Sequence, residues 1–325
     1  MKKKLLETLR CPECGSQLRF DGAVDSSDDL REGLIACPAS HRFPIVAGIQ
    51  RFVPPENYAA NFGFQWNHFK CTQLDRHSGT TITRERFFAQ SGWTPAELKG
   101  RLVLDVGCGA GRFADIALST GAIVIALDYS SAIDAAVENL GSDSNLHAVQ
   151  GDIFKLPFAA GVFDFVYCFG VLQHTPDVER AFAALPKVLK KGGRLAVDVY
   201  PWLVGNIAMT KYWFRPVTKR IPHERLFGMV QSFVRAFHPF ARKVARVPVV
   251  GRKLRHVLPI SVYDGVLPLD DKQLLEWSVL DTFDMLAPAH DHPKSVRTLR
   301  RWFTAAGLHE VETFRLGVAV GRARK

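Results

Sequence analysis

The sequence predicts an α/β protein built on a doubly wound, mostly parallel, seven-stranded sheet, with a small N-terminal β module and a helical insertion that forms a cap. Three observations predict this organisation. Between residues 100 and 200, short apolar runs typical of buried strands alternate with helical segments. The first of these runs enters a glycine-rich loop, as at the first crossover of a doubly wound sheet. A cysteine-containing segment precedes this region, and a strongly basic segment follows it.

The strands of the sheet are expected where apolar runs end beside glycine or acidic residues. The first spans residues 101–106 and runs into Gly107, Cys108 and Gly109. Further strands are expected at 122–127, 145–150, 163–168 and 194–200, and a helix at about 178–189. Parallel strands of this kind bind ligands at their carboxyl ends, so the residues that follow each strand are the candidate site residues.

The C-terminal end continues the same pattern after a long interruption. Residues 293–307 are predicted to form a helix, with proline near its start and glycine past its end. A hairpin is expected at 309–315 and 317–322. The sheet domain therefore comprises residues 100–200 and 293–325. We expect lid or linker helices at 56–99 and an insertion at 201–292.

The net charge is concentrated in the insertion. The 325 residues are 47% hydrophobic and 23% charged, which excludes a disordered or collagen-like chain. The formal net charge is +10, yet residues 201–260 alone hold twelve Lys or Arg and one acid, Glu224. The remainder of the chain is close to neutral, so the charge concerns what approaches the insertion and says little about the fold.

Five apolar residues of the insertion recur at helical spacing, interleaved with arginines: Leu226, Val230, Phe233, Val234 and Phe237. We expect this helix to break at His238-Pro239 and a second basic stretch to follow at 242–255. Three interpretations stay open. The segment is a cap whose apolar face covers the sheet domain, a peripheral contact with an anionic membrane or lipid-like substrate, or a contact with RNA phosphates.

The first 55 residues contain a candidate metal site. Cys11, Cys14, Cys37 and His41 stand in a C-x2-C…C-x3-H arrangement, and zinc prefers four such ligands. Few large apolar residues accompany them, so a metal would substitute for a core. The alternative is a redox CxxC pair, which would need a thioredoxin-like βαβ context that is absent. His41 would act as the fourth ligand, because Ser40 stands where a common ribbon has cysteine.

Six cysteines are too few for a disulfide-stapled secreted domain of this length, and no run of eighteen apolar residues occurs. We therefore expect a cytoplasmic protein with no transmembrane helix. The segments CPECGSQL and CPASHRFPIVAGI resemble the zinc-ribbon modules fused to some bacterial methyltransferases. Ribosomal RNA guanine methyltransferases carry a similar ribbon, and related short modules act as methyltransferase partners. The resemblance implies a zinc-ribbon-like module at residues 1–55.

The sheet domain resembles the class I S-adenosylmethionine-dependent methyltransferases, which have a Rossmann-like fold. The segments VLDVGCGAGRF, ALDYS, QGDIFKLPF, FDFVYCFGVLQHTPD and LKKGGRLAVDVY carry this likeness. The resemblance implies the following cofactor residues: Asp105, Gly107, Cys108 and Gly109 around the methionine moiety, Asp128 on the ribose, Tyr129 beside the adenine, Asp152 on the adenine amino group, Ile153 against the ring, and the backbone of Phe169 and Gly170 near the sulfonium.

Methyl transfer from a sulfonium is an in-line displacement, so it needs positioning and sometimes a base. His174, just past the fourth strand, is the best candidate base; the alternative is a loop residue that packs beside Asp177. The amino-base signature Asn/Asp-Pro-Pro-Tyr/Phe is absent, and residues 168–171 hold its place. The segment 290–292 has metal-ligand residues, but a loop before Pro293 is favoured. Residues 62–66 resemble the lid segment of small-molecule methyltransferases.

Three functions are compatible with these features. We favour methylation of a hydroxyl or amine on a small molecule, glycan precursor or lipid, because the insertion supplies an enclosed cap. RNA base methylation would use the ribbon and the basic insertion. A non-catalytic, cofactor-binding adaptor would use the ribbon to dock a partner.

Overall fold

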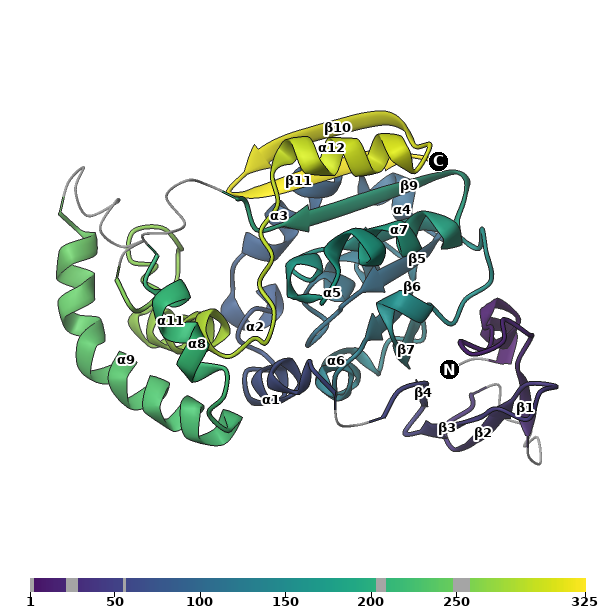
Figure 1. The fold of residues 1–325 in the computed structure, drawn as a ribbon, viewed down its shortest axis with the longest axis horizontal. Helices are drawn as coiled ribbons and strands as arrows, with labels where there is room; N and C mark the ends of the chain where they lie inside the picture. Colours follow the sequence, from purple (N-terminus) through teal and green to yellow (C-terminus); the bar gives the residue numbers. More distant parts are fainter. Residues whose placement is uncertain (1–2, 22–28, 55–56, 203–208, 248–257) are drawn as a thin grey trace.

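The computed structural model describes residues 3–21, 29–54, 57–202, 209–247 and 258–325. Figure 1 shows three parts in a row: an N-terminal module, a central sheet with helices on both faces, and a group of helices at the far end. The strands are β1 (Arg19–Asp21), β2 (Gly33–Ala36), β3 (Arg42–Val46), β4 (Ile49–Arg51), β5 (Leu102–Val106), β6 (Ile123–Asp128), β7 (Leu146–Gln150), β8 (Phe163–Cys168), β9 (Leu189–Val199), β10 (His309–Leu316) and β11 (Val318–Arg324).

The helices divide between the linker, the sheet domain and the cap. They are α1 (Ala60–His68), α2 (Asp75–Ser78), α3 (Ile82–Ser91), α4 (Pro95–Leu98), α5 (Arg112–Leu118), α6 (Ala132–Leu140), α7 (Val178–Val188), α8 (Lys211–Thr218), α9 (His223–Ala245), α11 (Asp271–Leu286) and α12 (Val296–Ala305). Short 3-10 turns are η1 (Lys3–Thr8), η2 (Ile153–Lys155) and η3 (Leu172–His174).

The predicted seven-stranded sheet is confirmed, in the order β7-β6-β5-β8-β9-β11-β10. The strands β7, β6, β5, β8 and β9 are parallel, while β11 is antiparallel to both β9 and β10. Side chains alternate across this sheet as the strand period of two requires. Leu104 and Val106 pack with α7 and α12 on one face, and Val103 packs with α3 and α5 on the other. The carboxyl ends of the parallel strands therefore lie at one edge, between these helical layers.

The N-terminal module is joined to the sheet more closely than a separate domain would be. The strands β1 to β4 pair in sequence, and β4 then pairs in parallel with β7, so that Gln50 lies opposite Val149. The result is one eleven-stranded sheet. The β4 strand covers the edge of β7, which would otherwise expose unpaired backbone groups.

The insertion forms a helical cap made of α8, α9 and α11. Leu226, Val230 and Val234 of α9 pack against Leu280 and Phe283 of α11 in one apolar cluster. The linker helix α1 joins this cluster through its partly buried aromatic residues Phe64 and Trp66. The expected apolar face of α9 is thus confirmed for its buried members, but Phe233 is exposed.

The prediction that α9 breaks at His238-Pro239 is wrong. The helix runs without interruption from His223 to Ala245. Proline removes one intrahelical hydrogen bond, but the ring of Pro239 lies on the exposed side. Packing of Val234 and Ala241 in the cap core, on either side of the proline, compensates for that loss. The expected second basic stretch, 242–255, lies partly outside the described residues, which stop at 247 and resume at 258.

Within the described residues, no helix is long and apolar enough to cross a membrane. The segment 290–292 is a loop before α12, as favoured from the sequence. Its Asp291 forms ion pairs with Lys211 and Arg215. The donors that could hold a metal within the described residues gather elsewhere, in the N-terminal module.

Candidate active site

The glycine-rich loop after β5 is tied to the end of β6. The N–H groups of Gly107 and Cys108 both donate to the carbonyl of Leu127, at 2.7 and 3.0 Å. Gly107 has φ +80°, and a Cβ there would lie 2.3 Å from a methyl group of Val171. A larger residue is therefore excluded by both conformation and space. The loop leaves open space at the carboxyl end of β5, and Cys108 and Gly109 line it.

Asp128, the last residue of β6, anchors this loop. Its Oδ2 accepts from the Gly109 N–H at 2.9 Å, and its Oδ1 accepts from the Ser130 N–H and hydroxyl at 2.8 and 2.7 Å. Burial raises the pKa of Asp128, and these hydrogen bonds oppose that rise. Asp128 also lines the open space beside this loop, so its carboxylate faces a possible ligand.

Two tyrosines stand beside Asp128. The rings of Tyr58 and Tyr129 lie 4.9 Å apart at 31°, and the buried Ile153 lines the same region. Burial raises the pKa of Tyr129, and the charge of Asp152 adds to that rise. Asp152 itself caps η2, where its Oδ1 accepts from the Phe154 N–H at 2.9 Å. Tyr58 was not predicted, because only the path of the chain before α1 brings it here.

One cavity of about 970 Å³ lies between the strand ends and the cap. This volume is at the upper end of the usual range for small-molecule sites, about 300–1,000 Å³. The predicted residues that line it are Gly107, Cys108, Gly109, Asp128, Tyr129, Ile153, Phe169, Gly170 and His174. Asp105 and Asp152 do not belong to this lining. The sequence therefore placed most of its candidate residues around one space.

Asp105 lies behind the cavity wall. It is 2% exposed, and its Oδ2 has no hydrogen-bond partner among the described residues. Burial raises the pKa of Asp105 to about 8. Because side chains alternate along β5, Asp105 points to the face that carries Val103, under α5.

The cap supplies the other end of the cavity. Ile260, Val262 and Leu280 form apolar walls, and Trp277 lies among them. Two tyrosine–carboxyl pairs interrupt these walls: the Tyr263 hydroxyl donates to Asp281, and the Tyr200 hydroxyl donates to Asp284 at 3.2 Å. Burial raises the pKa of Asp281 to about 6. The two acids were not predicted, since only the fold of the insertion brings α11 over the strand ends.

His174 lines the cavity between the strand ends and the cap. Its Nδ1 is 3.0 Å from the carbonyl of His290, which fixes Nδ1 as the protonated nitrogen. Its Nε2 is buried and has no partner among the described residues, so it offers a free lone pair. The ring contacts Phe62 and Tyr200, with centroids 5.0 and 5.4 Å away. Burial lowers the pKa of His174, so the imidazole is neutral at pH 7.

The turn after β8 is held by the buried carboxylate of Asp198. The Gly170 N–H donates to Asp198 of β9, and Asp198 also accepts from Arg86 at 2.7 Å. Arg86 and Arg112 line the cavity, and burial lowers the pKa of Arg112 to about 9. Arg112 donates to Thr83 and Gln73, at 2.9 and 2.7 Å, which positions α3 against the glycine-rich loop.

Comparison with known proteins matches this part of the chain to a family. Residues 104–197 match the family model described as a methyltransferase domain. This stretch contains the glycine-rich loop, Asp128 and the β8 turn, which are the elements that line the inner end of the cavity. The chain carries a class I S-adenosylmethionine-dependent methyltransferase domain. Its seven-stranded sheet, with β11 antiparallel beside β9, has the class I methyltransferase fold.

Curated relatives match about a third of the chain. A sterol 24-C-methyltransferase of Gibberella zeae is 38% identical over 113 residues, which cover 33% of this chain and 29% of that protein. A demethylmenaquinone methyltransferase of Thermobifida fusca is 36% identical over 121 residues, covering 36% and 51%. A ubiquinone biosynthesis O-methyltransferase of Coxiella burnetii is 38% identical over 100 residues, covering 30% and 43%. The chain thus spans about half of these relatives' length or less.

Solved structures resemble the chain over more of its length. Human N-acetylserotonin methyltransferase, in complex with S-adenosylmethionine, has a TM-score of 0.46 and 14% identity, covering 84% of this chain and 60% of that chain. A chain of the complex between the Haloferax volcanii Trm112 methyltransferase activator and a methyltransferase has a TM-score of 0.48 and 15% identity, covering 84% and 98%.

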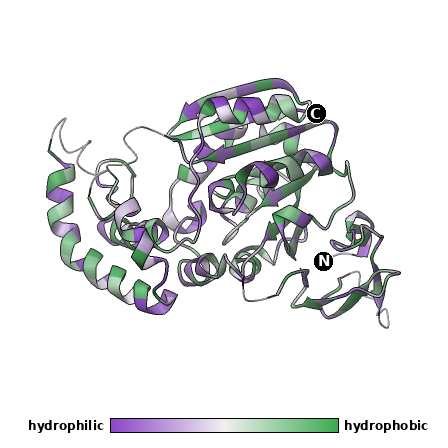
Figure 2. Ribbon diagram, viewed as in Figure 1, coloured by the Kyte–Doolittle hydropathy of each residue, from purple (hydrophilic) through white to green (hydrophobic). Residues whose placement is uncertain are grey.

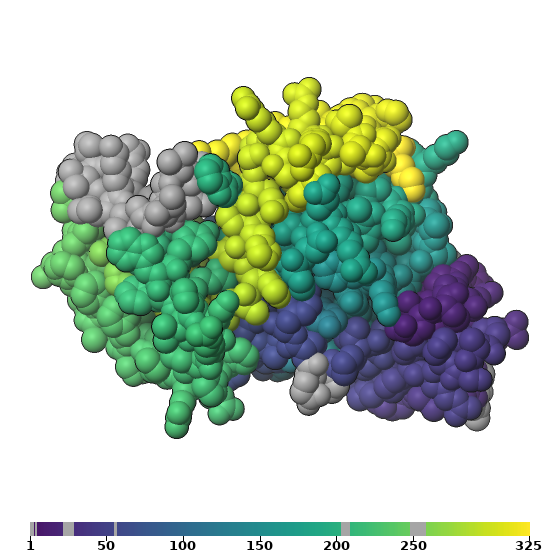
Figure 3. Space-filling view, in the orientation of Figure 1, coloured from purple at the N-terminus to yellow at the C-terminus, as the bar shows by residue number. Residues whose placement is uncertain are grey.

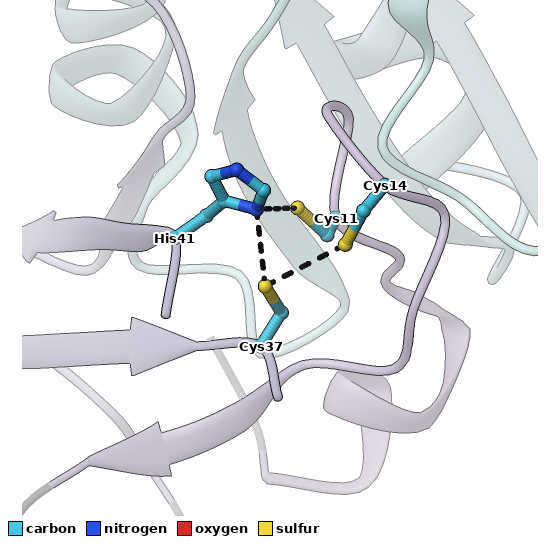
Figure 4. A group of neighbouring side chains, drawn as sticks. All are labelled: Cys11, Cys14, Cys37 and His41. Carbon is cyan, nitrogen blue, oxygen red and sulfur yellow. Dashed lines mark hydrogen bonds between the residues drawn. The ribbon is translucent and has the colours of Figure 1, made fainter. Parts of the chain in front are cut away.

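The N-terminal module brings its four predicted ligands together (Figure 4). Sγ of Cys11, Cys14 and Cys37 and Nδ1 of His41 all lie within 4.8 Å of one another. His41 Nδ1 is 3.5 Å from Cys11 Sγ and 3.3 Å from Cys37 Sγ, and Cys14 Sγ is 3.6 Å from Cys37 Sγ. A zinc–sulfur bond of 2.3 Å in a tetrahedron places ligand atoms about 3.5–3.8 Å apart. The donor set therefore fits zinc.

Two tight turns create this arrangement. The Gly15 N–H donates to the carbonyl of Cys11 at 2.8 Å, and the Ser40 N–H donates to the carbonyl of Cys37 at 2.9 Å. Ser40 has φ +64°, a left-handed conformation at the tip of the second turn. The next residue, His41, then faces the cysteines. Hydrogen bonds from Ser16 lower the pKa of Cys14 to about 6, which favours the thiolate that zinc binds.

Proposed function

We propose that the protein transfers a methyl group from S-adenosylmethionine to a hydroxyl or amine of a lipophilic small molecule. The observation that carries this proposal is one cavity of about 970 Å³, which joins the glycine-rich loop to a largely apolar chamber under the cap. A donor at the inner end and an acceptor under the cap would share one space. Binding in one space aligns the two reactants, which is the main requirement of an in-line displacement.

The residues at the inner end suit the cofactor. Asp128 would accept from the ribose hydroxyls, and Tyr58, Tyr129 and Ile153 would enclose the adenine. Asp152, whose charge influences both tyrosines, would accept from the adenine amino group. The loop at Gly107, Cys108 and Gly109 would surround the methionine moiety, with Asp105 behind it. The backbone of Phe169 and Gly170 would lie near the sulfonium. When bound, S-adenosylmethionine supplies an electrophilic methyl group.

His174 would act as the base. Its Nδ1 is held by the carbonyl of His290, so the free Nε2 would accept the proton that the acceptor group loses. A neutral imidazole is required for this, and burial maintains it by lowering the pKa of His174. The contacts with Phe62 and Tyr200 fix the ring plane.

The chamber under the cap would select a lipophilic acceptor. Apolar side chains of the cap dominate it, and the polar groups are gathered in the pairs Tyr263–Asp281 and Tyr200–Asp284. Such a combination suits a molecule with an apolar body and a polar reacting end. The names of three curated relatives refer to a sterol, a menaquinone and ubiquinone, which also have large apolar parts.

We do not propose an RNA acceptor or an adaptor role. Several cations of the insertion are used inside the cap: Lys211 and Arg215 pair with Asp291, and Arg242 pairs with Asp264. These three side chains are therefore not available to neutralise phosphates along an RNA strand. A chamber with a positioned base is, in addition, unnecessary in a protein that only binds the cofactor.

The test of this function is release of S-adenosylhomocysteine by the purified protein. With S-adenosylmethionine present, we expect release above the background rate when a total lipid extract is added, and no increase when total RNA is added. A heat-treated protein sample serves as the control for chemical turnover. Stimulation by RNA and not by lipid would contradict the proposal, as would the absence of stimulation by every extract.

We also propose that the N-terminal module, at residues 1–55, holds a structural zinc ion through Cys11, Cys14, Cys37 and His41. Purified protein is expected to contain about one zinc per chain by elemental analysis. Cys37→Ser should lower that content at least tenfold, because three donors hold zinc much more weakly than four. Cys71→Ser is the matched control, since Cys71 lies outside the module and should leave the zinc content unchanged. Full zinc content in Cys37→Ser would show that the metal lies elsewhere.

A further inference from the structure

The outer side of α9 carries apolar side chains that nothing in the described chain covers. Met229, Phe233 and Phe240 are between 42% and 58% exposed. Their spacing of four and then seven residues places them on one stripe of the helix, beside the buried stripe of Leu226, Val230 and Val234. Phe237 stacks on Phe233 and contacts Phe240, with centroids 5.4 and 5.1 Å away. The exposed stripe is thus a continuous apolar surface.

The short helix α8 also has exposed apolar side chains. Trp213 and Val217 are each 65% exposed, and Phe214 is also exposed. Between them, Arg215 turns inward and donates to Asp291 and to the carbonyls of Pro288 and His290. The one cation of this helix turn is buried, while its large apolar residues face outward. That is the reverse of the usual pattern on a solvated helix.

Cations extend the stripe on α9. Arg225 precedes Met229 by four residues and Lys243 follows Phe240 by three, so both lie on the same side of the helix. Lys219, Arg220 and Arg235 add to the charge around it. These five side chains are exposed and form no ion pair with a described residue, unlike Arg215 and Arg242. The one acid between residues 201 and 260 is Glu224.

We propose that this outer face of α8 and α9 docks on an anionic lipid bilayer, with α9 lying in the plane of the surface. An apolar stripe with aromatic residues enters the headgroup and acyl boundary, while flanking arginines and lysines meet lipid phosphates. Charge complementarity excludes a second copy of the chain as the occupant, because its cations would face these cations. RNA binding would use aromatic stacking and cations, and it would gain nothing from the exposed Met229 and Val217.

The docking face adjoins the chamber under the cap. Lys211 and Tyr212, at the start of α8, line the cavity, while Trp213 and Val217 of the same helix face outward. Figure 3 shows the green cap residues forming one end of the molecule and the purple N-terminal module the other. In Figure 2 the ribbon of α9 alternates between hydrophobic and hydrophilic segments along its length. A bilayer on this face would therefore meet the acceptor end and not the zinc module.

The proposal concerns docking itself, and it deepens the proposed function by naming the source of a lipophilic acceptor. The test is flotation of the intact protein with vesicles of phosphatidylcholine alone or with 30 mol% phosphatidylglycerol. We expect binding to the anionic vesicles, weakened by high salt and much weaker on neutral vesicles. R225Q/K243Q should lower the partition coefficient about thirtyfold. M229S/F233S/F240S should lower it at least a hundredfold.

The matched control is R297Q/R300Q, which removes the same charge from exposed positions on α12, outside the cap. It should bind anionic vesicles as the wild type does. Circular dichroism and S-adenosylmethionine binding show whether each variant stays folded. Equal losses in the control, or no anionic preference in the wild type, would overturn the docking face. If the wild type binds RNA but not vesicles, and R225Q/K243Q loses that RNA binding, the partner of this face is RNA and not a bilayer. Loss of methyl transfer alone would refute the proposed function and leave docking unaffected.

Discussion

Asp128→Asn is expected to weaken S-adenosylmethionine binding about a hundredfold or more. The carboxylate of Asp128 ends β6 inside the cavity and would accept both ribose hydroxyls of the cofactor. Hydrogen bonds to a charged acceptor contribute about 1.5–3 kcal/mol each, and two of them correspond to at least two factors of ten in affinity. An asparagine amide keeps one acceptor and presents a donor where the hydroxyls donate. Calorimetric titration measures the dissociation constant.

The control for this variant must separate ligand contact from loop structure. Asp128 also accepts from the Gly109 N–H and from Ser130, so its replacement affects the glycine-rich loop. Thermal unfolding of the unliganded variant reports that effect. Asp143→Asn changes an exposed acid outside the cavity and should leave the affinity unchanged. Wild-type affinity in Asp128→Asn would show that the cofactor does not use this end of the cavity.

His174→Gln is expected to lower kcat by a factor of about 10² to 10⁴, the usual contribution of a general base. The affinity for S-adenosylmethionine should stay within about twofold, because the ring is proposed to contact the acceptor and not the cofactor. His77→Gln, on the exposed helix α2, is the control and should keep full activity. A parallel fall in cofactor affinity would indicate that His174 shapes the site and does not take the proton.

The pH dependence follows from the same residue. Burial lowers the pKa of His174, so the base becomes protonated only below its ordinary value of about 6.5. We expect kcat to fall on the acid side of that value, and this acid limb should be absent in His174→Gln. The stability of the fold changes in the same direction. Below pH 6.5, His174 binds protons more readily in the unfolded chain than in the folded one, so it destabilises the fold as the pH falls. An acid limb that persists in the variant would assign it to another group.

The local parts of the fold and site followed from sequence. The loop at Gly107 directly follows β5, and Asp128 ends the next strand, β6, so their pattern alone places them at the carboxyl ends of neighbouring strands. Asp105 shows the limit of motif likeness, because side-chain alternation along β5 turns it behind the cavity wall. That alternation was present in the sequence and could have placed Asp105 correctly.

The long-range parts could not be predicted. Tyr58, Asp281 and Asp284 reach the cavity only because α1 and α11 pack over the strand ends, and no local pattern encodes that packing. Pro239 predicted a helix break, but tertiary contacts of α9 override the local preference. The pairing of β4 with β7 likewise depends on an edge strand some 100 residues further along the chain.

In the proposed reaction, a methyl group passes within one cavity from a cofactor at the strand ends to an acceptor under the cap. A single-turnover experiment measures this most directly: protein saturated with methyl-labelled S-adenosylmethionine is mixed with lipid extract, quenched, and partitioned into organic and aqueous phases. We predict that label enters the organic phase with the wild type and is retained in the cofactor with His174→Gln, which still binds it. Label that stays in the cofactor with both proteins, or that enters the organic phase equally with both, would contradict this account.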